Sequence, residues 1–263
     1  MKILFSPSEG KRHTEISRAQ ADFSFLDDLP SKGEALRAHI ARYRELLNQD
    51  DTIIAKMLGF KHLGSQGAMD ELLLCTHLGK TSTIEAIRLY DGVSYKALDF
   101  ENLPQRAQEY VLGHTLICSN LFGLVRASDK LAFYKCNQNF KFQDFSLQTL
   151  YKRLAPIIDV YLGDALILDL RAEIYIKAYP LKGRNIRIEF YQDGKKISHY
   201  AKYYRGLYLR ALSLEMSSLK GERIEEMEPE RIEMQLERLE IQGARLAKKD
   251  SHHNTTTLVY QLV

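Results

Sequence analysis

The chain has 263 residues, of which 45% are hydrophobic and 27% are charged. This balance supports a sizeable buried core and excludes the composition of an intrinsically disordered protein. The net charge of +3, from 37 Lys and Arg against 34 Asp and Glu, is too small to identify a nucleic-acid-binding protein by itself. Acidic residues concentrate at 222–240, so the remainder of the chain is more basic than the total indicates.

The cysteines and the apolar runs indicate the compartment. Cys75, Cys118 and Cys136 lie far apart with no C-x-x-C spacing, which argues against a disulfide framework and for a reducing environment. The N-terminal apolar run is too short for a signal peptide, and no stretch reaches the roughly 18 apolar residues that a membrane-spanning helix needs. We therefore expect a cytoplasmic protein with no membrane partner.

Two features suggest metal or thiol chemistry only weakly. We expect the adjacent His252 and His253 to lie in a loop. They have no third ligand at a usable spacing, so we expect no bound metal and no other cofactor. Cys136 follows Lys135 and is the only cysteine whose sequence neighbour would lower the pKa of its thiol.

The predicted elements of the N-terminal half begin with a buried strand at 2–6, which ends at Pro7 because proline cannot donate to a continuing strand ladder. Apolar residues at helical spacing predict a helix over 31–48, with Ser31 as its N-cap and Glu34 completing a capping box. Further helices are expected at 51–58, 67–76 and 104–112, followed by a strand at 115–118.

The C-terminal half continues with a helix over 146–162, interrupted near Pro156, and a buried strand at 165–170. The pair Asp193-Gly194 between the runs 186–192 and 195–198 predicts a β-hairpin. Helices are expected at 198–216 and 230–241, and a closing strand at 255–263. This mixture predicts an α+β (mixed α/β) fold, a single domain over 1–263 with a partly antiparallel sheet and surrounding helices.

The helix predicted at 198–216 is amphipathic. One arc of its helical wheel, which we expect to pack against the core, holds Tyr200, Tyr203, Tyr204, Leu207, Ala211 and Leu214. The opposite arc is basic, without an acid to neutralise it, and holds His199, Lys202, Arg205, Gly206 and Arg210. A solvated helix face is the simpler interpretation. Gly206 favours a contact instead, since a helix-interior glycine costs about 1 kcal/mol against Ala and often marks close backbone approach.

Polar loops at strand ends form a second group of candidates, because a sheet holds such loops in place and their N–H groups can face an anion. One loop carries Ser8, Glu9, Lys11 and Arg12, and another carries Asp169 and Arg171. Neither loop matches a P-loop, and each alone is also compatible with an ordinary turn.

The segment 119–129 is a third candidate. A glycine within an apolar turn, followed by Arg126, would let backbone N–H groups and a guanidinium meet a phosphate. Core packing by Leu121, Phe122 and Leu124, with Asp129 as a cap, is the alternative, and the two roles are compatible.

Five segments together resemble the YaaA family of peroxide-stress proteins. They are ILFSPSEGK at 3–11, YDGVSYKAL at 90–98, SNLFGLVRASD at 119–129, DLRAEIY at 169–175 and SHYAKYYRG at 198–206, in the order of the family. The resemblance implies a cytosolic bacterial protein that limits the damage done by hydrogen peroxide and reactive iron. It also implies DNA binding, a positively charged groove and a helix-hairpin-helix-like element near 120–126.

Two functions from different classes remain open. The first is a stress protein that binds nucleic acid, with duplex DNA as the expected partner, through Ser8, Lys11, Arg12, Arg126, Arg171, Lys202, Arg205 and Arg210. The second is an enzyme acting on a phosphorylated or nucleotide-like small molecule, with Glu9, Asp169 and His199 as the acid or base candidates. In both cases we expect Lys11, Arg171 and Lys202 to lie in one site.

Overall fold

The main sheet is mixed, with parallel strands at its centre and an antiparallel strand at each edge. The computed structural model describes residues 1–18, 20–198, 200–219 and 227–263. Across the main sheet the strands are β11 (Ala244–His252), β12 (Thr255–Leu262), β9 (Asn185–Gln192), β8 (Ile167–Leu170), β1 (Lys2–Phe5), β3 (Thr115–Ser119) and β4 (Gly123–Arg126). From β12 to β3 all neighbours are parallel, whereas β11 and β4 are antiparallel to their partners.

Three short strand pairings extend this architecture. Strand β10 (Lys195–Lys196) pairs with β9 and completes a hairpin. Strand β2 (Thr83–Glu85) pairs with β5 (Lys130–Ala132), and β6 (Lys141–Phe142) pairs with β7 (Phe145–Ser146). The ribbon of β2 and β5 lies outside the main sheet and forms part of a pocket described below.

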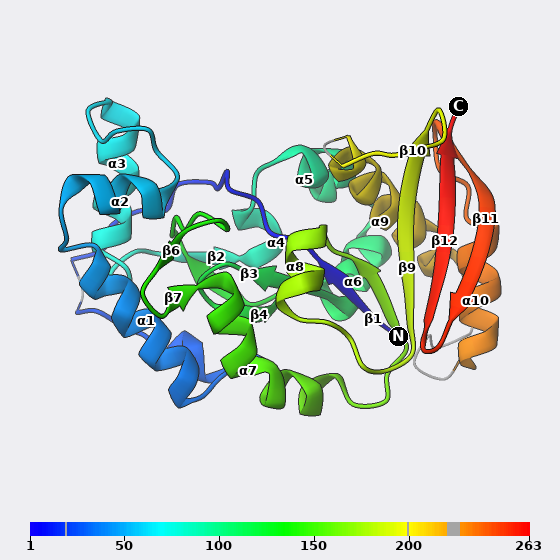
Figure 1. Cartoon of the computed structure of the whole chain (residues 1–263), viewed down its shortest axis with the longest axis horizontal. Coiled ribbons are helices and arrows are strands. Elements are labelled where there is room, and N and C mark those ends of the chain that lie inside the picture. The colour runs from blue at the N-terminus through cyan, green and yellow to red at the C-terminus, as the bar shows by residue number, and fades with distance from the viewer. Residues whose placement is uncertain (19, 199, 220–226) are drawn as a thin grey trace.

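Helices cover both faces of the main sheet, which explains why β1 is a continuous apolar run rather than an alternating one. Figure 1 shows α7 (Leu147–Leu162) and α8 (Glu173–Ala178) in front of the sheet, with α6 (Gln105–His114) and α9 (Ala201–Ser218) behind it. The remaining helices are η1 (Ser24–Asp27), α1 (Glu34–Leu46), α2 (Asp51–Leu58), α3 (Gln66–Thr76), α4 (Ala86–Leu89), α5 (Val93–Leu98), η2 (Phe100–Asn102) and α10 (Pro229–Arg238).

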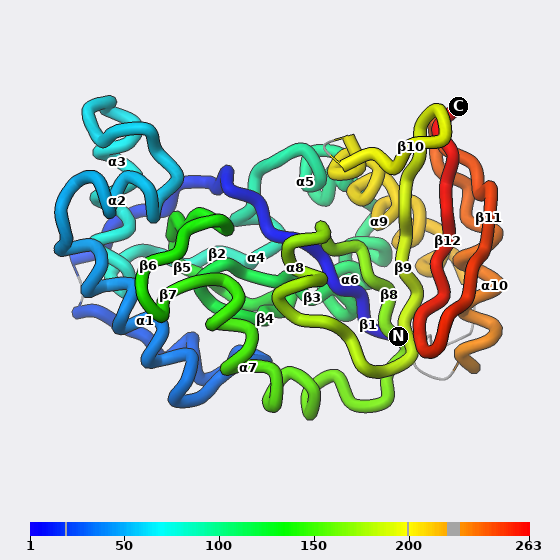
Figure 2. The backbone as a smooth tube through the Cα atoms, viewed as in Figure 1, coloured from blue at the N-terminus to red at the C-terminus, as the bar shows by residue number. Residues whose placement is uncertain are grey.

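The two ends of the molecule differ in structure. Figure 2 shows α1, α2 and α3 at one end and the β9, β12 and β11 strands at the other. The buried hydrophobic residues between them belong to one contiguous cluster. The α+β class and the partly antiparallel sheet are thus confirmed, while the single domain over 1–263 stays a prediction. Among the described residues, no helix has the length and apolar character needed to cross a membrane.

The turn at Asp193-Gly194 confirms the predicted hairpin. Both residues have positive φ, 50° and 73°, as a two-residue turn matched to strand twist requires. Glycine adopts this conformation without strain, and Asp is among the few other residues that tolerate it.

Four local predictions were wrong. Helix α1 begins at Glu34 with Gly33 as its N-cap, because the Ser31 hydroxyl instead donates to the carbonyls of the β4 region, at 3.0 Å from both Phe122 O and Leu124 O. Helix α7 continues through Pro156, which is exposed, so the carbonyl that proline leaves without a donor can reach water. The loop expected at His252-His253 is only partly present, because His252 is the last residue of β11 and His253 lies in the turn before β12.

The fourth correction concerns the helix-hairpin-helix-like element expected near 120–126. These residues join and form the antiparallel pair β3–β4, with Ser119 opposite Gly123 in the register. The apolar residues Leu121, Phe122 and Leu124 are buried there, so the packing role proposed for them is confirmed.

Candidate functional site

The carboxyl ends of three central strands meet at one edge of the sheet. Strand β1 pairs with β3 on one side and with β8 on the other, and all three run parallel. The chain passes from β1 to β3 and later returns to the opposite side of β1 as β8. This is a topological switch point, where open α/β sheets commonly bind ligands beyond the carboxyl ends of the strands.

Hydrogen bonds from Ser6 link these strand ends. The Ser6 hydroxyl accepts from the backbone N–H of Ala172, just after β8, at 2.7 Å. The Ser6 carbonyl accepts from the hydroxyl of Tyr95 in α5 at 2.9 Å. The loop that follows β1 is therefore attached both to the end of β8 and to α5.

Lys11 holds the same loop from inside. Its side chain is buried, and its Nζ donates to Ser8 O at 2.8 Å and lies 4.3 Å from the Tyr134 ring centroid and 5.3 Å from that of Tyr90. Burial, together with the nearby charge of Lys135, lowers the pKa of Lys11 to about 8. Lys11 therefore closes the loop with its charged end turned into the protein.

Asp169 and Arg171 form a buried ion pair at the end of β8. Arg171 donates from Nε and Nη2 to the two Asp169 carboxylate oxygens, both at 2.8 Å, and from Nη1 to Tyr179 O at 2.9 Å. Both side chains are fully buried. Burial lowers the pKa of Arg171, but the adjacent Asp169 carboxylate more than offsets this and raises it above its ordinary value. The charged groups of Asp169 and Arg171 bond to each other and are buried, so neither is exposed to bind a ligand.

A network of tyrosine and amide groups lies beside this ion pair, and the sequence analysis did not identify it. The Tyr175 hydroxyl lies 2.8 Å from Asn120 Oδ1 and 2.9 Å from Gln138 Oε1, and Asn120 Nδ2 donates to Cys136 O at 2.9 Å. The signal that was available is the presence of Tyr175 and Asn120 in two of the five family segments. The network connects the ends of β3 and β8 through side chains.

Gly206 in α9 makes the close approach that its position in a helix suggested. A Cβ atom at Gly206 would lie 2.0 Å from Ser94 O and 2.8 Å from Ala97 Cβ, both in α5. Helix α5 is thus the neighbour that approaches the backbone of α9 closely at Gly206. This position belongs to the packing of α9 on α5 rather than to a ligand site.

The face of α9 expected to pack is only partly buried. Tyr204 is 8% exposed and packs on Phe190 of β9, with ring centroids 5.3 Å apart, whereas Tyr200 is 58% and Tyr203 37% exposed. Leu214 is also exposed, at 38%. The wheel was wrong for these three because α9 packs chiefly on α5 and α6. The buried residues of α9 are Ala201, Tyr204, Gly206, Tyr208, Leu209, Leu212, Ser213 and Met216.

The basic residues of α9 have different environments. Lys202 is exposed and has no ion-pair partner in the part of the chain that the structure describes. Arg205 is partly buried, and desolvation lowers its pKa despite the charges of Asp169 and Glu173 at the end of β8. Arg210 donates to Leu98 O at 2.9 Å at the end of α5, so it contributes to the fold.

The other candidates lie at the rim of the strand-end region or elsewhere. Glu9 is exposed, Ser8 donates its hydroxyl proton to Asp91 O at 3.1 Å, and Arg12 forms an exposed ion pair with Glu101 at 3.6 Å. Arg126 lies at the far edge of the sheet. His199 lies outside the described residues. The structure therefore brings together the Ser8 loop, the end of β8 and Arg205. Of the two carboxyl candidates described there, Glu9 is exposed to solvent and Asp169 is buried.

The described cysteines have the properties of core residues. Cys75, Cys118 and Cys136 are free and buried. Burial raises the pKa of Cys136 to about 12, so its neighbour Lys135 does not activate it. Among the described residues there is also no group of three His, Cys, Asp or Glu that could hold a metal ion, and the expectation of no metal stays a prediction.

The fold and the strand-end region define a mixed α/β protein with a polar switch-point site and a basic, tyrosine-rich helix beside it. Residues 1–234 match the family model described as "Peroxide stress protein YaaA". The chain belongs to this family of peroxide stress proteins.

Curated relatives span most of the chain. An uncharacterized protein of Campylobacter jejuni is 40% identical over 213 residues, covering 80% of this chain and 83% of the relative. A UPF0246 protein of Corynebacterium glutamicum is 30% identical over 267 residues, covering 98% and 100%. A UPF0246 protein of Streptomyces coelicolor is 29% identical over 220 residues, covering 81% and 82%.

Proposed function

We propose that this peroxide stress protein binds nucleic acid through a surface at the start of α9, composed of Tyr200, Lys202 and Tyr203 and called here the α9 surface. The observation that carries the proposal is the exposure of two tyrosine rings beside a lysine that has no ion pair among the described residues. Aromatic rings next to cations are the combination with which proteins contact nucleotide bases and phosphates together.

The tyrosine rings of the α9 surface are held in place by their packing. Tyr200 and Tyr203 lie 5.7 and 5.5 Å, centroid to centroid, from the ring of Tyr204. Tyr204 is in turn buried against Phe190 in the sheet. The exposed rings therefore lose little conformational freedom when a ligand covers them, which favours binding.

The charge around the α9 surface also favours a polyanion. Lys202 has no ion pair among the described residues, and neither does the exposed Lys195 in the adjacent β10 hairpin. Phosphate contacts made by such lysines release counterions and dominate sequence-tolerant affinity. Duplex DNA is the partner we propose, in the cytoplasm, where protection of DNA would limit iron-mediated oxidative damage.

The salt dependence of DNA binding tests this proposal. Replacing Lys202 by Gln should flatten the slope of log affinity against log salt for duplex DNA by about 0.9 if Lys202 meets one phosphate. Replacing Tyr203 by Ala should weaken binding to single-stranded DNA by about 1–3 kcal/mol if its ring stacks on an unpaired base, because the bases of a duplex are already stacked on one another. Fluorescence anisotropy with a labelled duplex and a labelled single strand at several KCl concentrations measures the two effects.

The matched control is Lys152→Gln, which removes an exposed lysine of α7 that has no ion pair among the described residues. Helix α7 lies on the opposite face of the sheet from α9 (Figure 1), so this variant should keep the wild-type slope. An unchanged slope in a Lys202→Gln variant that unfolds at the wild-type temperature would exclude the α9 surface.

No specific contact favours the alternative enzyme that uses Glu9, Asp169 and His199. Asp169 is occupied by Arg171, Glu9 is exposed, and His199 lies outside the described residues. A site for a phosphorylated small molecule is supported elsewhere in the structure, without these three residues.

A further inference from the structure

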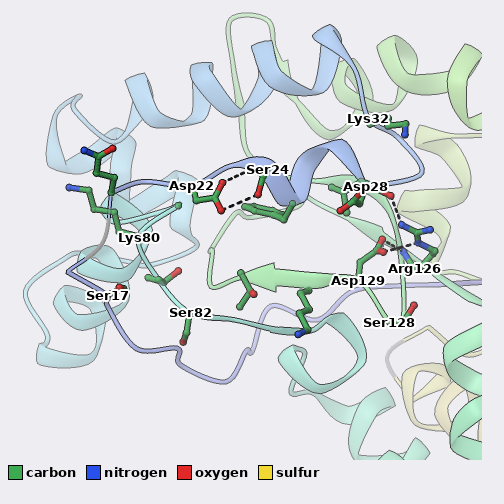
Figure 3. Close-up of a pocket in the computed structure, with 17 residues that line it drawn as sticks. Ser17, Asp22, Ser24, Asp28, Lys32, Lys80, Ser82, Arg126, Ser128 and Asp129 are labelled. Atoms are coloured by element: carbon green, nitrogen blue, oxygen red, sulfur yellow. Dashed lines mark hydrogen bonds and ion pairs between the residues drawn. The ribbon is translucent and has the colours of Figure 1, made fainter.

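A polar cavity of about 1010 Å³ lies beside β4 and shares no lining residue with the α9 surface. Three parts of the described chain form its walls: Ser17 with 20–32, which includes η1; 79–83, leading into β2; and 126–130, leading into β5. Figure 3 shows its side chains arranged around a common space, with Lys80 on one side and Lys32 and Arg126 on the other.

Backbone hydrogen bonds hold the walls together. The N–H of Asp22 donates to Gly79 O at 2.7 Å, and that of Ser82 donates to Glu15 O at 2.8 Å. Strand β2 pairs with β5 in the register that places Glu85 opposite Lys130. The cavity is therefore built from segments that are attached to one another before any ligand arrives.

Arg126 is oriented by two of these segments. Its Nε donates to Asp129 Oδ1 at 2.7 Å, and its Nη2 donates to the carbonyl of Asp28. Its backbone N–H donates to Asp129 Oδ2 at 2.7 Å. Its Nη1 has no hydrogen-bond partner among the described residues, so Nη1 and the second Nη2 proton can still donate to an anion in a bidentate contact.

Three lysines in the cavity are available for an anion. Lys32, Lys80 and Lys130 are exposed and have no ion-pair partner among the described residues, although Asp22, Asp28 and Asp129 also line the cavity. The Asp22 carboxylate accepts hydrogen bonds from Ser24, at 2.8 Å from its N and 3.0 Å from its Oγ.

Thr81 supplies an independent indication of a ligand. It lines the cavity, is 8% exposed, and its Oγ1 has no hydrogen-bond partner among the described residues. A buried hydroxyl without a partner is uncommon, and one that lines a polar cavity can bond to a group that enters it. A polar ligand in the cavity provides that group.

We propose that this cavity binds a phosphorylated small molecule, with the phosphate groups held by Arg126 and the three lysines and a further polar group held by Thr81. The volume is at the upper end of the range for small-molecule sites. Walls on three sides suit a free ligand better than a continuous nucleic-acid backbone. The inference does not depend on the nucleic-acid function proposed for the α9 surface.

Isothermal titration of the full-length protein with ADP and with inorganic pyrophosphate tests the proposal. We expect saturable binding of at least one of them, weakened at least tenfold in Lys32→Gln/Lys80→Gln and about fivefold in Thr81→Val. Lys152→Gln should bind as the wild type does. Thr81→Val removes an unbonded hydroxyl at nearly constant shape, so it should remain folded even if the lysine variant does not.

Several results would overturn the proposal. These are no binding of either probe to the wild-type protein, equal weakening in Lys152→Gln, or unchanged binding in a folded Thr81→Val variant. Displacement of bound ADP by duplex DNA would also overturn it and would assign the cavity to the nucleic-acid backbone. Lys202→Gln should leave ADP binding intact, which keeps failure of this proposal distinguishable from failure of the α9 surface.

Discussion

At the residue scale, Asp169 and Arg171 should contribute to stability rather than to binding. Arg171→Met would leave the fully buried Asp169 carboxylate without its partner, so we expect a loss of about 3–5 kcal/mol in the free energy of unfolding. Urea denaturation measures this loss. Arg153→Met is the control, because its pair with Asp144 is exposed and should cost less than about 1 kcal/mol. Similar small losses in both variants would contradict the assignment.

Lys11 should make stability depend on pH. Its pKa is lowered from 10.5 to about 8 in the folded protein, chiefly by burial, so between these values the unfolded chain binds more protons than the folded one. The free energy of unfolding therefore rises with pH across this window, by about 2 kcal/mol from pH 8 to pH 10 for this residue. Below pH 8 the full penalty of burying the charged amine is present.

Comparison with Lys11→Met isolates this contribution, because the other lysines and tyrosines titrate in both proteins. Urea denaturation at pH 8 and pH 10 should show a larger rise in stability for the wild-type protein than for the variant. Parallel changes in the two proteins would mean that Lys11 is not held as a buried amine.

At the element scale, the packing of α9 on α5 depends on Gly206. Gly206→Ala would place a methyl group 2.0 Å from Ser94 O, and the two helices must separate to accommodate it. We expect a loss of about 1–3 kcal/mol in the free energy of unfolding, measured by thermal or urea denaturation.

Gly113→Ala is the matched control for this prediction. Gly113 lies in α6, and nothing is within 4 Å of the position its Cβ would take. Since alanine is the better helix former, this variant should gain up to about 1 kcal/mol. A neutral or stabilising Gly206→Ala would show that α5 and α9 do not touch at this point.

At the scale of the whole molecule, some basic residues are paired with acidic ones, whereas others have no ion pair among the described residues. Arg184 pairs with Glu230 and Glu233 of α10, at 2.9 and 2.8 Å, and Lys249 pairs with Glu237 at 2.7 Å. Part of the acidic charge of 227–240 is thus neutralised by Arg184, just before β9, and by Lys249 of β11. Exposed cations on α9 and in the cavity beside β4 keep their charge, so a net charge of +3 is compatible with two basic surfaces.

The purified protein should carry far less than one iron or zinc per chain. The described residues contain no group of three His, Cys, Asp or Glu that could bind such an ion, and their cysteines are buried with raised pKa values. Elemental analysis of protein purified without chelators measures the content. A value near one metal per chain would contradict this prediction and would indicate that the protein chelates the metal directly.

The sequence by itself determined most elements, the class of the fold and the family. These properties depend on local signals, such as the apolar run of β1, the Asp193-Gly194 turn and five short segments in a fixed order. The tertiary structure decided which partner each polar group meets. Ser31 bonds to β4 rather than capping α1, Arg171 is occupied by Asp169, and Gly206 meets α5. In each case the packing of the chain or its local geometry decides which partner the residue contacts. A helical wheel or a strand pattern does not contain this information.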